Sequence, residues 1–559
     1  MKREKFSMTS EVETEQIGLR ALPQRQISIT FAGVLLAMFL GSLDQTIVGT
    51  AMPRIISDLG GFTHYTWITI SYMIASTVAV PITGKLIDMY GRKKLYIAGL
   101  GIFIVCSLLS GLSQTMTQII IFRGLQGIGG GIMIANAFTL IGDLFPPGER
   151  GKYQGIMSGV FGLSSIIGPP LGGFLTDSLS WHWIFFINIP LGLIVIALFM
   201  LFFPDVRPDI VKHKVDYYGV ITLILAVVPA LLALSWGGVD YPWLSVEIIG
   251  MFVFSIIMGS AFIIIEQRGQ NPIIPLSLFN NRILAVSEIV IFFTGIGMFG
   301  SIIFVPLFFQ GVLGVSATTS GSFLTPMMLG MVGGSFVSGQ LLSRAGGHYR
   351  TQGAVGIAIM AAGMYLLSRM TIETSYSTAV MNIVITGFGL GITMPLYTIA
   401  VQNAVPYEVL GVATSSTAFF RSIGGSVGLA IFGSVMNNRF ASSFMGALPS
   451  SVKTVIPTEQ LDLLVRNPQA LVSVEAQAQL KSMFEALGAQ GMTIFEQVLQ
   501  VLRQALDSAL SEVFLVGVGV LIVAFVVNFF IKEIPLRKVH TMSVQLNSEH
   551  SDRIDKSQE

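Results

Sequence analysis

Four charged residues stand inside long apolar stretches of this sequence, where a charge is unfavourable. They are Asp44, Arg123, Glu288 and Arg421. A charged side chain at the centre of a membrane-spanning helix costs about 2.5–3.5 kcal/mol on insertion scales, so it persists where it faces water or a partner. A carboxylate can bind and release a proton, whereas an arginine keeps its own and changes the proton affinity of a neighbour. The four residues are therefore candidates for proton coupling or for contact with a charged substrate.

The stretches that hold Asp44 and Arg123 bring both residues to a broadly similar depth. Asp44 lies about 16 residues into one stretch and Arg123 about 8 residues into another of opposite direction, which places both in the outer half of a membrane at 1.5 Å per residue. The alternative role for Arg123 is a structural clamp on backbone carbonyls. Glu288 lies only about six residues from Arg282, so its side chain could also reach the membrane surface.

The composition indicates that the apolar stretches around these charges lie in a membrane. Of 559 residues, 52% are hydrophobic and 11% are charged, against about 25% charged in soluble domains. The net charge of +1 comes without a basic stripe, which argues against a nucleic-acid partner. The single cysteine, Cys106, excludes a disulfide within the chain and a thiolate metal cluster. We expect the lipid bilayer as a partner, and no metal or cofactor.

The apolar stretches predict an all-α polytopic membrane protein with about fourteen spans of about 20 residues each. Lysine and arginine gather in the even-numbered loops and are nearly absent from the short odd-numbered ones. The positive-inside rule then places both chain ends in the cytosol. The expected spans start near Ser28, Tyr65, Leu95, Thr115, Tyr153, Trp183, Tyr217, Ser245, Ile283, Thr319, Thr351, Tyr376, Leu410 and Ala509.

An internal repeat divides these spans into six, two and six. Gly127, Gly129 and Gly131 in the fourth span match Gly387, Gly389 and Gly391 in the twelfth, and residues 84–91 match residues 339–346. Repeats of the same orientation imply an axis along the membrane normal and a substrate site between the halves. We expect a cytosolic tail (1–27), a first bundle (28–203), two inserted helices (204–282), a second bundle (283–531) and a cytosolic tail (532–559).

One segment of the second bundle, residues 437–508, is too polar to cross a membrane. Apolar residues recur at helical spacing in Pro457–Leu464 and Ala476–Leu510, which predicts a small helical cap or surface helices outside the cell. The segment could contact an extracellular partner or shield the exit, and an ordered loop without a role in transport is the alternative.

Two glycine-containing motifs suggest moving parts. The sequence GKLIDMYGRKK, from Gly84 to Lys94, is a short turn that predicts a gate. Its glycines Gly84 and Gly91 permit close approach, and Asp88 can cap a helix end or pair with Arg92. A fifth span carries a second run, which predicts either close helix packing or a bending point. The residues of that run are Gly168, Pro169, Pro170, Gly172 and Gly173.

Taken together, these motifs resemble the major facilitator superfamily, and its fourteen-span drug:proton antiporter subfamily in particular. Five segments carry the resemblance: LDQTIVGTAMPRI from Leu43, the turn from Gly84, IFRGLQGIGGG from Ile121, GLSSIIGPPLGG from Gly162 and WHWIFFINIP from Trp181. Gly49 stands where the subfamily commonly has asparagine, His182 where arginine is usual, and Ser343 where the second-half turn would have aspartate. In the family the arginine at Arg123 is implicated in proton coupling and the fifth-span motif is associated with antiporters.

The resemblance implies a protein that is not an enzyme and that exports amphipathic, often cationic, compounds across the cytoplasmic membrane in exchange for protons. Asp44, with Glu288, would hold either protons or the substrate cation, and Arg123 would tune the proton affinity. The alternative is a dedicated exporter of one endogenous compound, such as a lipid, amino acid, siderophore or self-made antibiotic. Six polar side chains are expected to line the cavity: Gln45, Thr46, Gln126, Asn136, Tyr397 and Gln402.

Overall fold

The computed structural model describes residues 23–59, 66–203, 215–313, 324–345, 347–448, 481–482 and 489–536. These segments are helical, with short turns between them and no β-strand within them. Thirteen helices in this described part are long and apolar enough to cross a membrane. The predicted span near Thr319 corresponds to α12 (Leu324–Ala345), which is more polar but packs between two other helices of the molecule. The all-α polytopic fold is therefore confirmed.

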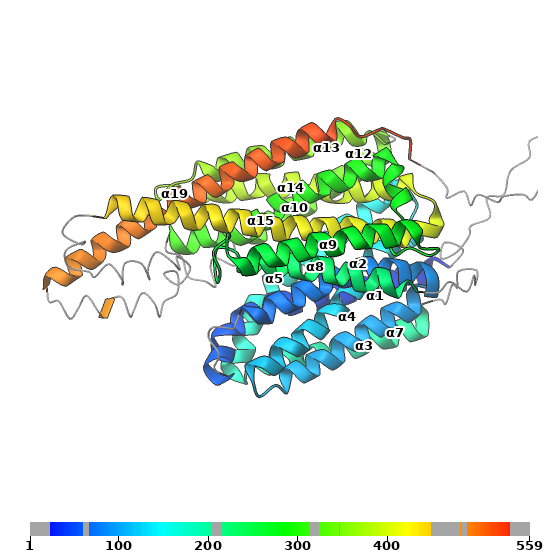
Figure 1. Cartoon of the computed structure of the whole chain (residues 1–559), viewed down its shortest axis with the longest axis horizontal. Helices are drawn as coiled ribbons and strands as arrows, with labels where there is room; N and C mark the ends of the chain where they lie inside the picture. Colours follow the sequence, from blue (N-terminus) through cyan, green and yellow to red (C-terminus); the bar gives the residue numbers. More distant parts are fainter. Residues whose placement is uncertain are drawn as a thin grey trace, which may run out of the picture.

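The first group of helices forms one bundle, drawn in blue and cyan in Figure 1. In it, α4 packs against α2 and α3, and α1 packs against α5 and α7. Its helices are α1 (Gln24–Leu59), α2 (Trp67–Tyr90), α3 (Arg92–Gly111), α4 (Met116–Leu144), α5 (Pro147–Ser178), and the span made by α6 (Trp183–Phe186) and α7 (Asn188–Phe202).

The second bundle contains the C-terminal helices, drawn in green to red. In it, α14 packs against α12 and α13, and α10 packs against α15 and α19. Besides α12, its elements are α10 (Arg282–Gly311), α13 (Tyr349–Ser368), α14 (Tyr376–Ala404), the short η4 (Tyr407–Val409), α15 (Leu410–Ala447) and α19 (Ala489–Asn528). The predicted residue bounds of the domains stay a prediction.

Two further helices lie along the seam between the bundles. They are α8 (Tyr217–Trp236) and α9 (Val246–Arg268), which pack on each other, and α8 also contacts α2 and α15 (Figure 1). The short η3 (Leu276–Asn280) leads from α9 to α10. Much of the surface of α9 is exposed and apolar, as expected of a helix that faces lipid.

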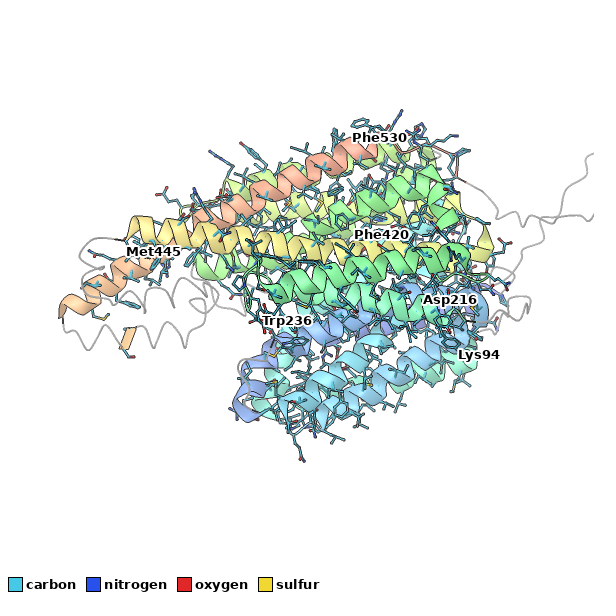
Figure 2. All side chains as sticks on the ribbon, viewed as in Figure 1. Lys94, Asp216, Trp236, Phe420, Met445 and Phe530 are labelled. Carbon is cyan, nitrogen blue, oxygen red and sulfur yellow. The ribbon has the colours of Figure 1, made fainter. Side chains whose placement is uncertain are left out.

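The two ends of the molecule differ in charge. Lys94 and Asp216 lie at one end, and Met445 lies at the other (Figure 2). We call the end with Lys94 the basic end, because α3 begins there at Arg92, α5 carries Arg150 in its first turn and α12 carries Arg344 in its last turn. Met445 marks the distal end.

The polar segment at the distal end is helical from Ala489, within the stretch Ala476–Leu510 where the sequence predicted helices. The helix that holds the last expected span therefore begins well before Ala509, because α19 is continuous from Ala489. Likewise α15 continues to Ala447, and both helices project beyond the rest of the bundle in Figure 1. Arg439 of α15 pairs with Glu512 of α19 at 3.0 Å. The predicted helix at Pro457–Leu464 lies outside the described residues.

The glycine repeat is confirmed by the way the two bundles pack internally. A Cβ atom on Gly127 would collide with the backbone of Tyr72 in α2, and one on Gly387 would collide with that of Met327 in α12. Gly129 and Gly389 likewise face α3 and α13. Matching glycines therefore bring matching helices to backbone contact in both halves.

Candidate functional site

Asp44 is the centre of a buried polar cluster in the first bundle. The Arg123 Nη1 atom donates to Asp44 Oδ2 at 2.6 Å, and Gln126 Nε2 donates to Asp44 Oδ1 at 3.0 Å. Asn188 Nδ2 also donates to Oδ1, at 2.8 Å. The carboxylate is fully buried and accepts from a guanidinium and two amides. Such a set of donors stabilises the charged form of a carboxylate.

Arg123 is held by aromatic rings as well as by oxygen atoms. Its guanidinium lies over the ring of Tyr72 at 4.5 Å and near that of Phe185 at 5.9 Å, and its Nη1 also donates to Gln126 Oε1 at 2.9 Å. Arg123 Nε has no hydrogen-bond partner within the described residues. The alternative of a clamp on backbone carbonyls is not what the structure shows, because these partners are side chains.

Helix α5 packs against the part of α1 that holds this cluster. A Cβ atom on Gly168 would come 2.1 Å from Thr46 Oγ1, and one on Gly172 would come 2.2 Å from Thr50 Oγ1. Pro169 and Pro170 lie inside the continuous helix between them. Gly173 has open space around its Cβ direction. Two of the three glycines in the run thus seat α5 against the part of α1 that carries Asp44.

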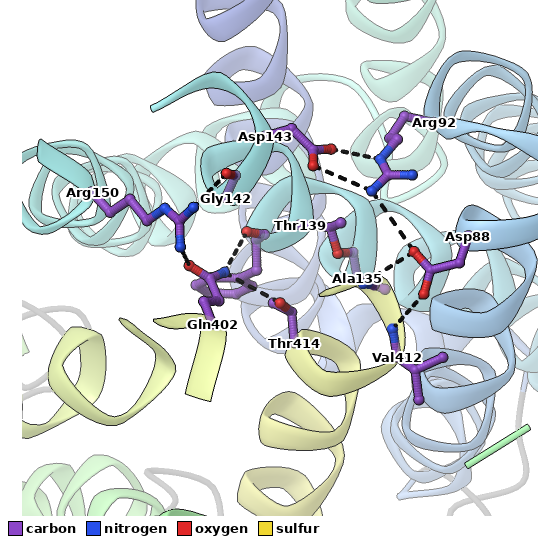
Figure 3. A network of polar contacts seen from close by, with 12 residues as sticks. Asp88, Arg92, Ala135, Thr139, Gly142, Asp143, Arg150, Gln402, Val412 and Thr414 are labelled. Atoms are coloured by element: carbon purple, nitrogen blue, oxygen red, sulfur yellow. Dashed lines mark hydrogen bonds and ion pairs between the residues drawn. The ribbon is translucent and has the colours of Figure 1, made fainter. Parts of the chain in front are cut away.

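At the basic end, Asp88 joins the two bundles. Its carboxylate accepts the backbone N–H groups of Gly411, at 3.1 Å, and Val412, at 3.0 Å (Figure 3). These two groups belong to the first turn of α15, where the helix dipole favours a negative charge. Both predicted roles of Asp88 are seen, because it caps a helix and also lies 3.7 Å from Arg92.

Arg92, which lies beside Asp88, also bonds α4 through Asp143. Its Nε donates to Asp143 Oδ2 at 2.5 Å, and its Nη2 donates to Asp143 Oδ1 at 3.2 Å. Gly91, with φ of 86°, forms the turn that brings Arg92 beside Asp88. A Cβ atom on Gly84 would collide with Ser415 and with the backbone of Gly411, so α2 and α15 are in backbone contact here.

A second polar contact between the bundles is made by Arg150. Its Nη1 donates to Gln402 Oε1 at 3.1 Å, and its Nη2 donates to Gly142 O at 2.6 Å (Figure 3). Gln402 Nε2 in turn donates to Thr414 Oγ1 and to Phe138 O. Arg150 is fully buried. In the described part, the hydrogen bonds between the bundles gather at this basic end.

The second bundle holds the other charged pair. Glu288 is 1% exposed, and its Oε1 lies 2.6 Å from Ser416 Oγ. Its side chain is therefore buried between helices and does not extend to the membrane surface, which was the alternative for a residue so near Arg282. Arg421 is five residues further along α15 and is partly exposed. The two residues are on facing helices without an ion pair within 4.0 Å among the described residues.

The sequence matches the family model of the Major Facilitator Superfamily over residues 34–429. The chain belongs to this superfamily. It is accordingly a multi-pass membrane transporter of small molecules and not an enzyme, which confirms the family and class that the motifs predicted.

Individual members of the superfamily resemble the chain over nearly its whole length. It is 41% identical to multidrug transporter protein MdtP of Bacillus subtilis, over 92% of this chain and 94% of that one. It is 37% identical to multidrug resistance protein 3 of Bacillus subtilis, over 94% and 99%. The crystal structure of the human organic anion transporter MFSD10 covers 89% of this chain and 100% of that one, with a TM-score of 0.54 and 14% identity, which shows the shared fold.

The six residues expected to line a facilitator cavity are placed in different surroundings. Gln126 belongs to the Asp44 cluster, and Gln402 belongs to the contact at the basic end. Tyr397 is fully buried, and its hydroxyl donates to Asn528 in α19 at 2.7 Å. Thr46 bonds the Ser164 carbonyl of α5, and Asn136 is buried with its amide on Ile132 O. Of these six residues, Gln45 is the one whose side chain is exposed in this conformation.

Several residues of the site were not predicted. Asn188, Tyr72 and Asp143 contact Asp44, Arg123 and Arg92 in that order. Ser107 bonds Asn188, and Arg150 bonds Gln402. Asn188 lies within the recognised motif from Trp181, and Asp143 precedes the turn at Pro146, so position in a motif was the available signal. The described residues hold no group of three or more His, Cys, Asp or Glu side chains able to bind a metal.

His182, one of the departures from the subfamily pattern, lies beside the distal end of the site. Its ring stacks on Trp181 with centroids 3.8 Å apart, and Nδ1 lies 3.3 Å from Ser180 Oγ. Partial burial lowers the pKa of this imidazole below its usual value, and Asp58 acts in the opposite direction. The lowered pKa favours the neutral form of this ring, which packs against Trp181.

Proposed function

We propose that this protein is a proton-coupled antiporter that exports amphipathic, often cationic, drugs or toxic compounds by alternating access. The single observation that carries the proposal is the buried Asp44–Arg123 pair, because a transporter with no use for charge would not bury one in a membrane bundle. The names of the relatives in Bacillus subtilis, which describe multidrug transport and resistance, support the substrate class.

The charge distribution supports the orientation. We propose that the basic end faces the cytosol of the cell and that the protein resides in the cytoplasmic membrane with both chain ends inside. The inter-bundle contacts of Asp88 and Arg150 then close the cytosolic side. In the proposed cycle, closure of the cytosolic side belongs to the outward-facing half, after substrate has left and when protons enter from outside.

The membrane potential can supply the free energy for coupling proton entry to substrate export. A proton that moves inward through a potential of 100 mV releases about 2.3 kcal/mol, which sustains a substrate gradient of tens-fold. Asp44 and Glu288 are the carboxylates available for this exchange, and Arg123 and Arg421 are the cations beside them. No other cofactor is part of the proposal.

The test is transport of ethidium, an amphipathic cation, by the purified protein in liposomes with an imposed pH gradient. We expect ethidium movement that depends on the gradient and stops with an uncoupler, and we expect Asp44→Asn to abolish it. Asp177→Asn is the matched control, because Asp177 is exposed at the distal end of α5. Unchanged gradient-driven transport in the Asp44→Asn protein would refute the role of this site. A compound panel in the same assay separates multidrug export from export of one endogenous compound.

A further inference from the structure

Glu288 and Asp44 have opposite hydrogen-bonding environments. Asp44 accepts hydrogen bonds from Arg123, Gln126 and Asn188, so both of its oxygens are satisfied as those of an anion. The side chain of Glu288 has a single hydrogen-bond partner, the Ser416 hydroxyl. Its Oε2 atom is buried and has no partner within the described part of the chain. A buried carboxylate oxygen without a donor is costly when charged and much less so when neutral.

The hydrogen atoms around Ser416 give a second argument. Ser416 Oγ lies 2.9 Å from Ala413 O and 2.6 Å from Glu288 Oε1. A serine hydroxyl has one hydrogen to donate, and the Ala413 carbonyl can only accept. That hydrogen would have to be shared if Glu288 were charged, whereas each contact is a full hydrogen bond when Glu288 carries a proton on Oε1 and donates it to Ser416 Oγ.

The helices around Glu288 give its carboxyl group no ion pair among the described residues. Arg421 of α15 is the charged residue that acts on Glu288, and it makes no ion pair with it within 4.0 Å among the described residues. Helix α14 and η3 carry no charged residue. Arg282 begins α10 and donates to Phe530 O. The charged residues of α19 lie toward the distal end, and α12 has Arg344 at its basic end.

The position of Glu288 links it to the closed contact at the basic end. Ser416 follows Ser415, which presses against Gly84 of α2, and both lie just after the turn of α15 that Asp88 caps. Beyond Glu288, α10 and α15 are in backbone contact, because a Cβ on Gly295 would lie 2.7 Å from Arg421 O. Separation of α2 from α15 at this seam would therefore expose the Glu288–Ser416 pair to water from the basic end.

We propose that Glu288 is the proton carrier of the exchange cycle, protonated in the conformation seen here, while Asp44 stays charged in its pair with Arg123. This rests on the proposed proton-coupled export. When the basic end opens, the Oε1–H bond of Glu288 breaks, its electron pair stays on the carboxylate, and the proton passes to a water molecule. Ser416 then turns its hydrogen from Ala413 O to the carboxylate, and Arg421 provides the facing positive charge.

Infrared spectroscopy of the full chain in liposomes tests the protonation directly. The wild-type protein should show the carbonyl stretch of a neutral carboxylic acid, and Glu288→Gln should remove it. Asp44→Asn should leave that band in place. Persistence of the band in the Glu288→Gln protein, or its loss in the Asp44→Asn protein, would overturn the proposal. This readout needs no transport, so it stands even if the proposed function fails.

A transport assay tests the role in coupling. Glu288→Gln mimics the protonated acid, so it should retain ethidium counterflow, which needs no net proton movement. Its gradient-driven accumulation of ethidium should fall from tens-fold to none. Glu247→Gln is the matched control, because Glu247 is exposed at the distal end of α9 and should accumulate ethidium as the wild type does. Retained accumulation in the Glu288→Gln protein would overturn the proposal. Absence of gradient-driven transport in the wild type would instead contradict the proposed function.

Discussion

At the scale of residues, the geometry of a single guanidinium organises the first bundle. Arg123 contacts Asp44, Gln126 and the Tyr72 ring together: its Nη1 donates to both side-chain oxygens while the planar guanidinium lies over the ring, which the compact ammonium of a lysine does not reproduce. A buried ion pair of this kind is destabilising when one partner is lost, by about 3–5 kcal/mol, because the other charge is left uncompensated. The pair is therefore sensitive even to substitutions that keep the charge.

Arg123→Lys is expected to impair transport strongly. A lysine ammonium is a compact charge that can reach Asp44 but cannot also keep the Gln126 bond while lying over Tyr72. The loss of a hydrogen bond to a charged group is worth about 1.5–3 kcal/mol, which corresponds to a decrease of about 10- to 100-fold in ethidium efflux rate. Efflux from cells or liposomes measures this. Arg439→Lys, at an exposed pair, is the control, and an equal loss in both variants would contradict the argument.

The sequence predicted the depth of the candidate residues better than it predicted where their side chains point. Distance along each helix placed Asp44 and Arg123 at one depth, and they are indeed bonded. The direction around the helix axis was not readable, because α4 and α14 are apolar on most sides and show no clear polar face. Tyr397 and Gln402 were therefore expected at a cavity, whereas they bond Asn528 and Arg150.

At the scale of elements, glycines set how closely the helices approach. Gly151 of α5 and Gly339 of α12 lie backbone to backbone at the basic end, and Gly84 of α2 contacts α15 in the matching place of the other half. Gly339 and Gly84 occupy equivalent positions in the repeat. The sequence predicted this equivalence, but it could not predict the partner helix, because each partner belongs to the other bundle.

Gly339→Val is expected to open the basic end. A Cβ on Gly339 would lie 2.5 Å from the backbone carbon of Gly151, and backbone cannot move aside as a flexible side chain can. Spin labels on cysteines at Lys94 and Glu408, both exposed and in different bundles, should move apart in a background without Cys106. Gly101→Val, where the Cβ direction is open, should leave the distance unchanged. Equal distances in the two variants would show that this contact does not hold the closed state.

At the scale of the whole molecule, two separate contacts close the basic end. One is the Asp88 carboxylate on the first turn of α15, and the other is the Arg150–Gln402 bond between α5 and α14. The residues of both lie beside the last turn of α4 in Figure 3. A rocking motion of one bundle against the other must break both, so each shifts the equilibrium between closed and open states by its own free energy.

Asp88→Asn is expected to shift this equilibrium toward the form open at the basic end. Gly411 N–H donates to Oδ1 and Val412 N–H to Oδ2, whereas an amide places an NH2 donor at one of these two positions and has no charge for the helix dipole to stabilise. A charge at a helix N-terminus is worth about 0.3–1 kcal/mol, up to about 2 kcal/mol when partly buried. The label pair at positions 94 and 408 should show a larger open fraction. Asp177→Asn should not change it, and a closed fraction unaffected by Asp88→Asn would contradict the role of this contact.

The two contacts are expected to be coupled through α4. Arg92, which pairs with Asp88, holds Asp143, while Arg150 holds the carbonyls of the flanking residues Gly142 and Phe145. A shift of this turn after one contact is lost should therefore weaken the other. In a double-mutant cycle of Asp88→Asn and Gln402→Ala, the open fraction should show a coupling of about 0.5–3 kcal/mol, as is usual for residues in one network. Additive effects would mean that the two contacts open independently and that α4 does not join them.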